Sequence, residues 1–106
     1  MAYTSEVVIA STWNIELIER MGEMMGEDGL HIPRNDDGKG LVGWYAPAMN
    51  IHRTPFTGRS FEYFSEDGFL SGQMGAAEVR GARSKGMITY IKHFALNDQD
   101  TNRKGL

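Results

Sequence analysis

The sequence predicts an α/β fold in which strands and helices alternate in the order β-α-β-α-β and the strands run parallel. Three short apolar runs have the length and the β-branched content of buried strands. The two segments between them carry apolar residues at helical spacing. Parallel strands gather functional groups beyond their carboxyl ends, where this chain places polar loops. The pattern alone does not distinguish a doubly wound sheet from an arc of a barrel.

The first half of the chain is expected to form a strand, a helix and a loop. Residues 6–10, Glu-Val-Val-Ile-Ala, are the first predicted strand. Asn14 is the predicted N-cap of the helix that follows. Gly26 and Gly29 are its candidate stops, and residues 29–40 have loop composition. The apolar stripe of this helix consists of Leu17, Ile18, Met21, Met24 and Met25.

The second half is expected to supply two more strands and a second helix. Residues 41–46 form the second predicted strand, and residues 48–68 are rich enough in polar and aromatic side chains for a functional loop. Residues 69–85 are the second predicted helix, with Gly86 as its C-cap. Residues 87–91 are the third strand. The predicted inner face of the second helix contains Leu70, Met74 and the small residues Ala77 and Gly81, which would let it lie close to a sheet.

Composition excludes several classes of protein. The chain has 106 residues, which is far short of the ~250 residues of a complete (β/α)₈ barrel. Its formal net charge is −3, and it has no block of Lys and Arg, so no nucleic-acid partner is expected. The absence of cysteine and the spacing of the histidines predict neither a metal site nor a cofactor. With no long apolar run and no signal-peptide pattern, no membrane partner is expected, and a cytosolic enzyme is compatible with the sequence.

Residues 52–67 form the first cluster with chemical potential, because arginines, glutamates and aromatic residues alternate there. The planar fork of an arginine suits paired acceptors such as vicinal sugar hydroxyls, and aromatic rings suit the apolar faces of sugars. The alternative is purely structural. In that case Arg53, Arg59, Glu62 and Glu66 pair with one another and fix the loop.

The second cluster begins with Lys92 and His93 at the end of the third strand. Asn97, Asp98 and Arg103 follow in a polar loop. Burying a charge is costly, so a strand that ends in such a pair favours a site with partners for it. In the alternative, Lys92 is solvated at the rim and His93 bonds to the backbone.

Together these segments resemble glycoside hydrolase family 3, and in particular its β-glucosidases. The likeness begins at residues 5–14 and strengthens at residues 45–50, Tyr-Ala-Pro-Ala-Met-Asn. It is most specific at residues 58–67, Gly-Arg-Ser-Phe-Glu-Tyr-Phe-Ser-Glu-Asp, and at residues 92–99, Lys-His-Phe-Ala-Leu-Asn-Asp-Gln. It covers nearly the whole chain, and the loop of residues 29–40 matches least.

The resemblance implies that residues 1–106 are a fragment of the N-terminal domain of such an enzyme, which is a TIM-like (β/α)₈ barrel. The implied activity is retaining hydrolysis of terminal non-reducing β-D-glycosyl residues. The implied partners are a β-glucoside or oligosaccharide substrate, the remainder of the barrel and the C-terminal domain of the parent enzyme. No cofactor is implied. An arc of a barrel has open strand edges, so the isolated chain is expected to be inactive, and unstable, oligomeric or aggregated.

The resemblance also assigns residues. It implies that Arg59, Lys92, His93 and Arg103 bind the terminal sugar in the −1 subsite, while Glu62 and Asp98 orient these cations. The nucleophilic Asp and the acid/base Glu of the family match no motif in this chain, so no catalytic residue is assigned. The alternative is a non-catalytic carbohydrate-binding or structural α/β fragment. A phosphate- or nucleotide-binding doubly wound domain would lack its Gly-rich loop.

Overall fold

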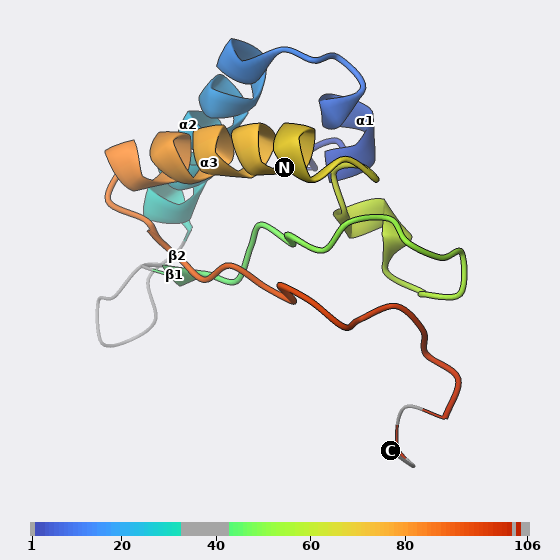
Figure 1. Ribbon diagram of the computed structural model, residues 1–106. Coiled ribbons are helices and arrows are strands. Elements are labelled where there is room, and N and C mark those ends of the chain that lie inside the picture. The colour runs from blue at the N-terminus through green and yellow to red at the C-terminus, as the bar shows by residue number, and fades with distance from the viewer. Residues whose placement is uncertain (1, 33–42, 103, 105–106) are drawn as a thin grey trace.

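A computed structural model shows a layer of helices lying over a short two-stranded parallel sheet, with the C-terminal segment running away from both (Figure 1). The structure describes residues 2–32, 43–102 and 104. The sheet pairs Gly43 with Ile88 and Trp44 with Thr89 in parallel, so the α/β class and the parallel pairing are confirmed. The elements in chain order are α1 Glu6–Ala10, α2 Ile15–His31, β1 Gly43–Trp44, the 3₁₀ helix η1 Ser60–Glu62, α3 Gly68–Ser84 and β2 Ile88–Thr89.

The prediction of a strand at residues 6–10 is wrong, because this segment is the helix α1. A short apolar run does not by itself separate a strand from a helix. Two hydroxyls following the run favour the helix: Ser11 Oγ donates to the carbonyl of Val7 at 2.8 Å, and Thr12 Oγ1 to that of Ile9 at 2.7 Å. The order of the described elements is therefore α-α-β-α-β rather than β-α-β-α-β.

The other two predicted strands exist but are assigned over fewer residues, and residues 41 and 42 lie outside the described part. Their backbones nevertheless stay together beyond the assigned strands. Tyr90 N donates to Trp44 O at 2.8 Å, and Lys92 N donates to Pro47 O at 3.0 Å. Met49 N then donates to Lys92 O at 2.6 Å. This ladder brings the segment after β1 beside the segment after β2.

Helix α2 begins as predicted but does not end as predicted. Asn14 Oδ1 accepts a hydrogen bond from Leu17 N at 3.0 Å, which confirms the N-cap. The helix continues through both candidate stops to His31. Gly26 has a packing role instead, since a Cβ there would lie 2.8 Å from Lys85 Cβ. Of the predicted stripe, Ile18 and Met21 are buried, whereas Leu17 and Met24 are exposed.

Helix α3 matches its predicted range closely, and Gly86 follows it with φ +87° as a C-cap glycine should. Its small residues do not face a sheet. A Cβ on Gly81 would collide with the carbonyl of Glu19 and lie 2.8 Å from Glu23 N, so this glycine permits a close crossing with α2. The core beneath this crossing contains Ile9, Ala10, Ile18, Met21, Phe64, Met74 and Ala77.

Candidate functional site

Glu62 joins a cation from each of the two predicted clusters. Arg59 precedes η1 and Glu62 ends it, and in a 3₁₀ turn side chains three residues apart lie one above the other. Arg59 Nε donates to Glu62 Oε1 at 2.9 Å, and its Nη2 contacts the same oxygen. Lys92 Nζ lies 3.0 Å from the other carboxylate oxygen. The structure thus brings Arg59, Glu62 and Lys92 into one cluster, which we call the Arg-Glu-Lys cluster.

Ala48 is the backbone contact that makes this convergence possible. It forms parallel bridges to both Tyr63 and Lys92 and is 1% exposed. Because Tyr63 directly follows Glu62, the two bridges place the carboxylate and the lysine on backbone segments that flank the segment of Ala48. Tyr63 also fixes the loop after Lys92, since its hydroxyl accepts from Asn97 Nδ2 at 2.5 Å and donates to Asn97 O at 3.3 Å.

The Arg-Glu-Lys cluster is half-buried and carries a net positive charge. The side chains of Arg59, Glu62 and Lys92 are 33%, 13% and 15% exposed. Burial acts to raise the pKa of Glu62, but its contacts with Arg59 and Lys92 outweigh burial and hold that pKa below the usual value. Lys92 Nζ also lies 5.7 Å from the centre of the Tyr45 ring. Such a cluster can donate hydrogen bonds to hydroxyl or anionic groups.

The other predicted site residues are His93, Asp98 and Arg103. His93 follows Lys92 and is half-buried. Asp98 is paired with Arg53 at 3.7 Å, so its ion-pair partner is the other arginine of the first cluster. Arg103 lies outside the described residues. The structural alternative is right about the Arg59–Glu62 pair, but Lys92 is not a solvated rim residue.

Sequence reasoning missed two supports of the site, His52 and Asp100. His52 Nε2 lies 2.7 Å from the carbonyl of Ser60 and its ring packs against Tyr63, which holds η1. Asp100 accepts a hydrogen bond from Gly58 N, which connects the loop after β2 with the loop after β1. The interleaving of His and Asp with the motif residues was the available signal, but it does not specify these partners.

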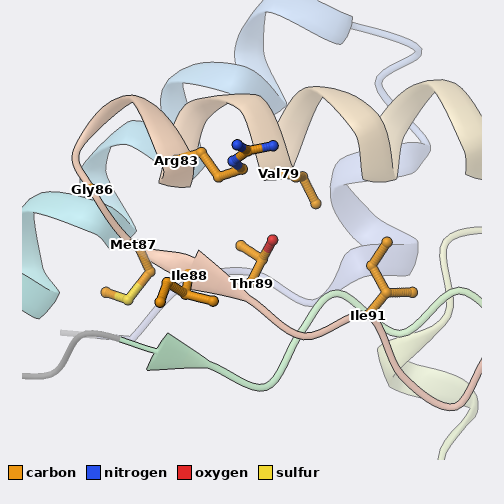
Figure 2. Close-up of a pocket in the computed structure, with 7 residues that line it drawn as sticks. All are labelled: Val79, Arg83, Gly86, Met87, Ile88, Thr89 and Ile91. Atoms are coloured by element: carbon orange, nitrogen blue, oxygen red, sulfur yellow. The ribbon is translucent and has the colours of Figure 1, made fainter.

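Two hollows lie along the ladder. One, of about 570 Å³, lies between α3 and β2, and Figure 2 shows Val79 and Arg83 of the helix facing Thr89 across it. The other, of about 300 Å³, borders the loops after the two strands and includes the Arg53–Asp98 pair. The lining of the second hollow is Met49, Asn50, Ile51, Arg53, Phe94, Ala95, Leu96 and Asp98.

Among the described residues, no group of three or more His, Asp or Glu side chains is placed to hold a metal ion. No helix within residues 2–32 or 43–102 is both long and apolar enough to span a bilayer.

Comparison with known proteins gives consistent matches. The family model described as the glycosyl hydrolase family 3 N-terminal domain matches residues 3–104. Beta-glucosidase A of Butyrivibrio fibrisolvens is 42% identical over 104 residues, which are 98% of this chain and 12% of that protein. An exo-alpha-(1->6)-L-arabinopyranosidase of Bifidobacterium longum is 41% identical over 95 residues, 90% of this chain and 12% of that protein.

A solved structure is similar to this chain in both fold and sequence. Beta-glucosidase 3B from Thermotoga neapolitana, in complex with glucose, superposes with a TM-score of 0.83 and 48% identity. The match covers 96% of this chain and 13% of that one. The chain therefore spans roughly an eighth of the length of the proteins that it resembles.

Proposed function

Because the chain belongs to the glycosyl hydrolase family 3 N-terminal domain family, we propose that it is part of a β-glucosidase-type glycoside hydrolase and supplies residues that bind the terminal sugar. The observation that carries this proposal is the convergence of Arg59 and Lys92 on Glu62. The proposed substrate class is a β-glucoside or oligosaccharide with a terminal non-reducing β-D-glycosyl residue. The relative crystallised with glucose supports a hexose as the ligand.

The geometry of the Arg-Glu-Lys cluster suits the −1 subsite. Arg59 uses its Nε and Nη2 toward Glu62, which leaves its Nη1 edge directed elsewhere. A guanidinium edge and an ammonium held at fixed positions can each donate to sugar hydroxyls. We assign His93 and Arg103 to the same subsite, Glu62 as the residue that orients the two cations, and Asp98 as a support through Arg53.

The proposed chemistry of the parent enzyme is retaining hydrolysis, which needs a nucleophile and an acid/base carboxyl roughly 5–5.5 Å apart. Glu62 does not suit the acid role, because Arg59 and Lys92 hold its pKa low and keep it ionised. We place the catalytic pair outside residues 1–106. Nearby cations would lower the pKa of an incoming nucleophilic carboxyl and keep it charged.

The proposed setting is a (β/α)₈ barrel, of which residues 1–106 are one arc of the N-terminal domain. β1, α3 and β2 form a parallel unit with a helical crossover, which is the repeating unit of such barrels. Ile88 in β2 and Ile91 in the segment after it are each more than half exposed. We propose that the next part of the barrel covers them and fills the hollow beside α3 (Figure 2).

A non-catalytic carbohydrate-binding or structural fragment is the second candidate. The composition of the Arg-Glu-Lys cluster favours it. The cluster has two hydrogen-bond donors bridged by one carboxylate, whereas catalysis would need a pair of carboxylates. Both readings predict sugar binding by the same residues. They differ in whether a longer protein performs chemistry.

Titration of glucose into the 106-residue chain, followed by NMR, tests the binding claim. We expect shifts concentrated at Arg59, Lys92 and His93, and at least tenfold weaker binding after Arg59→Ala, a loss of roughly 1.4 kcal/mol. Arg80→Ala is the matched control, because Arg80 is a surface arginine paired with Glu19. Equal effects of the two substitutions would exclude the Arg-Glu-Lys cluster as the sugar site.

The same substitution separates the two readings. In the parent enzyme, Arg59→Ala is expected to lower kcat/KM for a chromogenic β-glucoside by a factor of ten or more, again roughly 1.4 kcal/mol per tenfold. A carbohydrate-binding protein without chemistry shows no turnover to be lowered. Near-normal turnover in the variant would remove Arg59 from the subsite.

A further inference from the structure

Polar contacts join the loop after β2 to the loop after β1. Residues 93–102 belong to no helix or strand, so contacts with other segments decide the conformation of this loop. Three of these contacts are Asn97 with Tyr63, Asp98 with Arg53, and Asp100 with Gly58. Asn97 and Tyr63 are both buried, whereas the other two contacts are more exposed. The Tyr63–Asn97 pair therefore connects the two loops in the interior.

The Tyr63 hydroxyl fixes both the side chain and the backbone of Asn97. It accepts a hydrogen bond from Asn97 Nδ2 at 2.5 Å and donates one to Asn97 O at 3.3 Å. Tyr63 is itself held in place, since its backbone bridges to Ala48 and its ring centre lies 5.8 Å from that of His52. Without the hydroxyl, two buried polar groups of Asn97 would lose this partner, which costs free energy because burial deprives them of water.

Leu96, the residue before Asn97, has an unfavourable backbone conformation. Its φ of +62° lies in the left-handed region, where the Cβ of an L-residue comes too close to a carbonyl oxygen. Asn102 has a similar φ of +61°, but asparagine adopts this conformation more readily than leucine does. The Leu96 side chain is 86% exposed, so its packing does not offset the cost. Strain of this kind persists where neighbouring contacts impose it, and the hydrogen bonds between Asn97 and Tyr63 are the adjacent contacts.

We propose that Tyr63 and Asn97 are positioning residues, which hold Leu96 in its left-handed conformation and thereby fix the loop of residues 93–102. The loop begins with His93, directly after the lysine of the Arg-Glu-Lys cluster. Residues of the same loop line the hollow of about 300 Å³, so the Tyr63–Asn97 pair also shapes that hollow. The use of this loop in sugar binding rests on the proposed function, whereas the fixing of the loop does not.

Limited proteolysis measures how often the loop opens. Chymotrypsin cleaves after aromatic residues, and Phe94 is an exposed one within the loop. Where opening and closing are fast relative to cleavage, the rate follows the population of the open loop. Each rate is taken below the protein concentration of self-association and divided by that of a free peptide of residues 88–102 with the same residue at position 96. Cleavage after Trp13, which is exposed between α1 and α2, reports loosening of the whole chain.

Tyr63→Phe removes the hydroxyl and keeps the ring. We expect it to raise the relative rate after Phe94 by about tenfold and to leave the rate after Trp13 unchanged. Leu96→Gly, added to Tyr63→Phe, should bring the rate back to within about threefold of the unaltered chain, because glycine adopts a positive φ at little cost. The two more exposed contacts then suffice to hold the loop. A ring that merely filled space would show no such rescue.

Tyr90→Phe is the matched control, since it removes the hydroxyl of an exposed tyrosine. Asn97→Ala disrupts the pair from the other side, and combining it with Tyr63→Phe should open the loop little more than either change alone. The proposal is overturned if Tyr63→Phe and Tyr90→Phe behave alike, or if Leu96→Gly does not restore resistance. A parallel rise in cleavage after Trp13 would also overturn it, because the hydroxyl would then stabilise the whole chain rather than the loop.

Glucose titration of the same variants separates this inference from the proposed function. Tyr63→Phe should weaken glucose binding by about fivefold, and Leu96→Gly should restore it. If the loop opens while the affinity for glucose stays unchanged, Tyr63 and Asn97 do not position the sugar site. If the unaltered chain binds no glucose, the proposed function fails, and the cleavage rates alone decide whether the pair fixes the loop.

Discussion

Glu62 is the residue on which the cohesion of the candidate site depends, because it is the counter-charge of two half-buried cations. Glu62→Gln keeps the shape but leaves Lys92, only 15% exposed, without its carboxylate. We expect the free energy of unfolding at pH 7 to fall by about 1–2 kcal/mol. The midpoint of urea unfolding, taken at a protein concentration below that of self-association, measures it.

Acid should remove this difference. The folded pKa of Glu62 lies below its unfolded value, so its contribution is present above about pH 4.5 and is lost as the pH falls through the folded pKa. The unaltered chain and Glu62→Gln should therefore converge toward pH 3. Glu66→Gln, at an exposed position, should change stability by less than about 0.5 kcal/mol. A difference that persisted in acid would contradict the ionic role of Glu62.

The sequence predicts the residues of the Arg-Glu-Lys cluster, but not the backbone contacts that bring them together. Arg59, Glu62 and Lys92 were all named, because motif residues carry their chemistry in their identity. Their meeting depends on Ala48, whose backbone bridges both Tyr63 and Lys92. Such a contact leaves no mark in side-chain pattern. Asp98 pairs with Arg53, and its predicted support of the sugar-binding cations stays a prediction. The sugar-binding role of these residues stays a prediction.

At the scale of the elements, the crossing of α2 and α3 depends on glycine. Gly81→Ala adds a methyl group that would collide with the backbone of α2. Although alanine favours a helix by about 1 kcal/mol over glycine, overpacking against rigid backbone costs about 1–3 kcal/mol. We expect a net loss of stability and a lower urea midpoint.

Gly72 provides the matched control on the same helix. Nothing lies within 4 Å of a Cβ added there, so Gly72→Ala should show the helix preference alone and raise stability by about 0.5–1 kcal/mol. Opposite signs for the two substitutions are the expected signature. A stabilising Gly81→Ala would mean that the helices do not cross at that residue.

The sequence predicts the local features of these elements but not the features that depend on tertiary packing. The cap at Asn14 and the positive φ at Gly86 are local properties, and both were predicted. The sequence predicts a helix stop at Gly26, yet this residue lies within α2 against Lys85, which only tertiary packing reveals. The sequence predicts a strand at residues 6–10, where the structure has α1, because a short apolar run has the same pattern in either conformation.

The whole molecule is a slab rather than a closed domain. Its extents are 41 × 35 × 19 Å and its radius of gyration is 14.8 Å, whereas a compact domain of this length has a radius of about 13 Å. A two-stranded sheet has little stability on its own. Ile88, Tyr90 and Ile91 are 55%, 56% and 54% exposed along it. The helical layer thus covers one face of the sheet. Among the described residues, no further strand pairs with the edge of this two-stranded sheet.

An exposed apolar edge of this kind is a template for pairing with another chain, so we expect the isolated chain to self-associate in the micromolar range. A lysine on the edge should oppose this pairing, and Ile91→Lys is therefore expected to shift the chain toward monomer in sedimentation velocity. Ala76→Lys adds the same charge at an exposed position of α3 and should leave association unchanged. If the unaltered chain stayed monomeric throughout the micromolar range, the exposed edge would not be the interface with the rest of the proposed barrel.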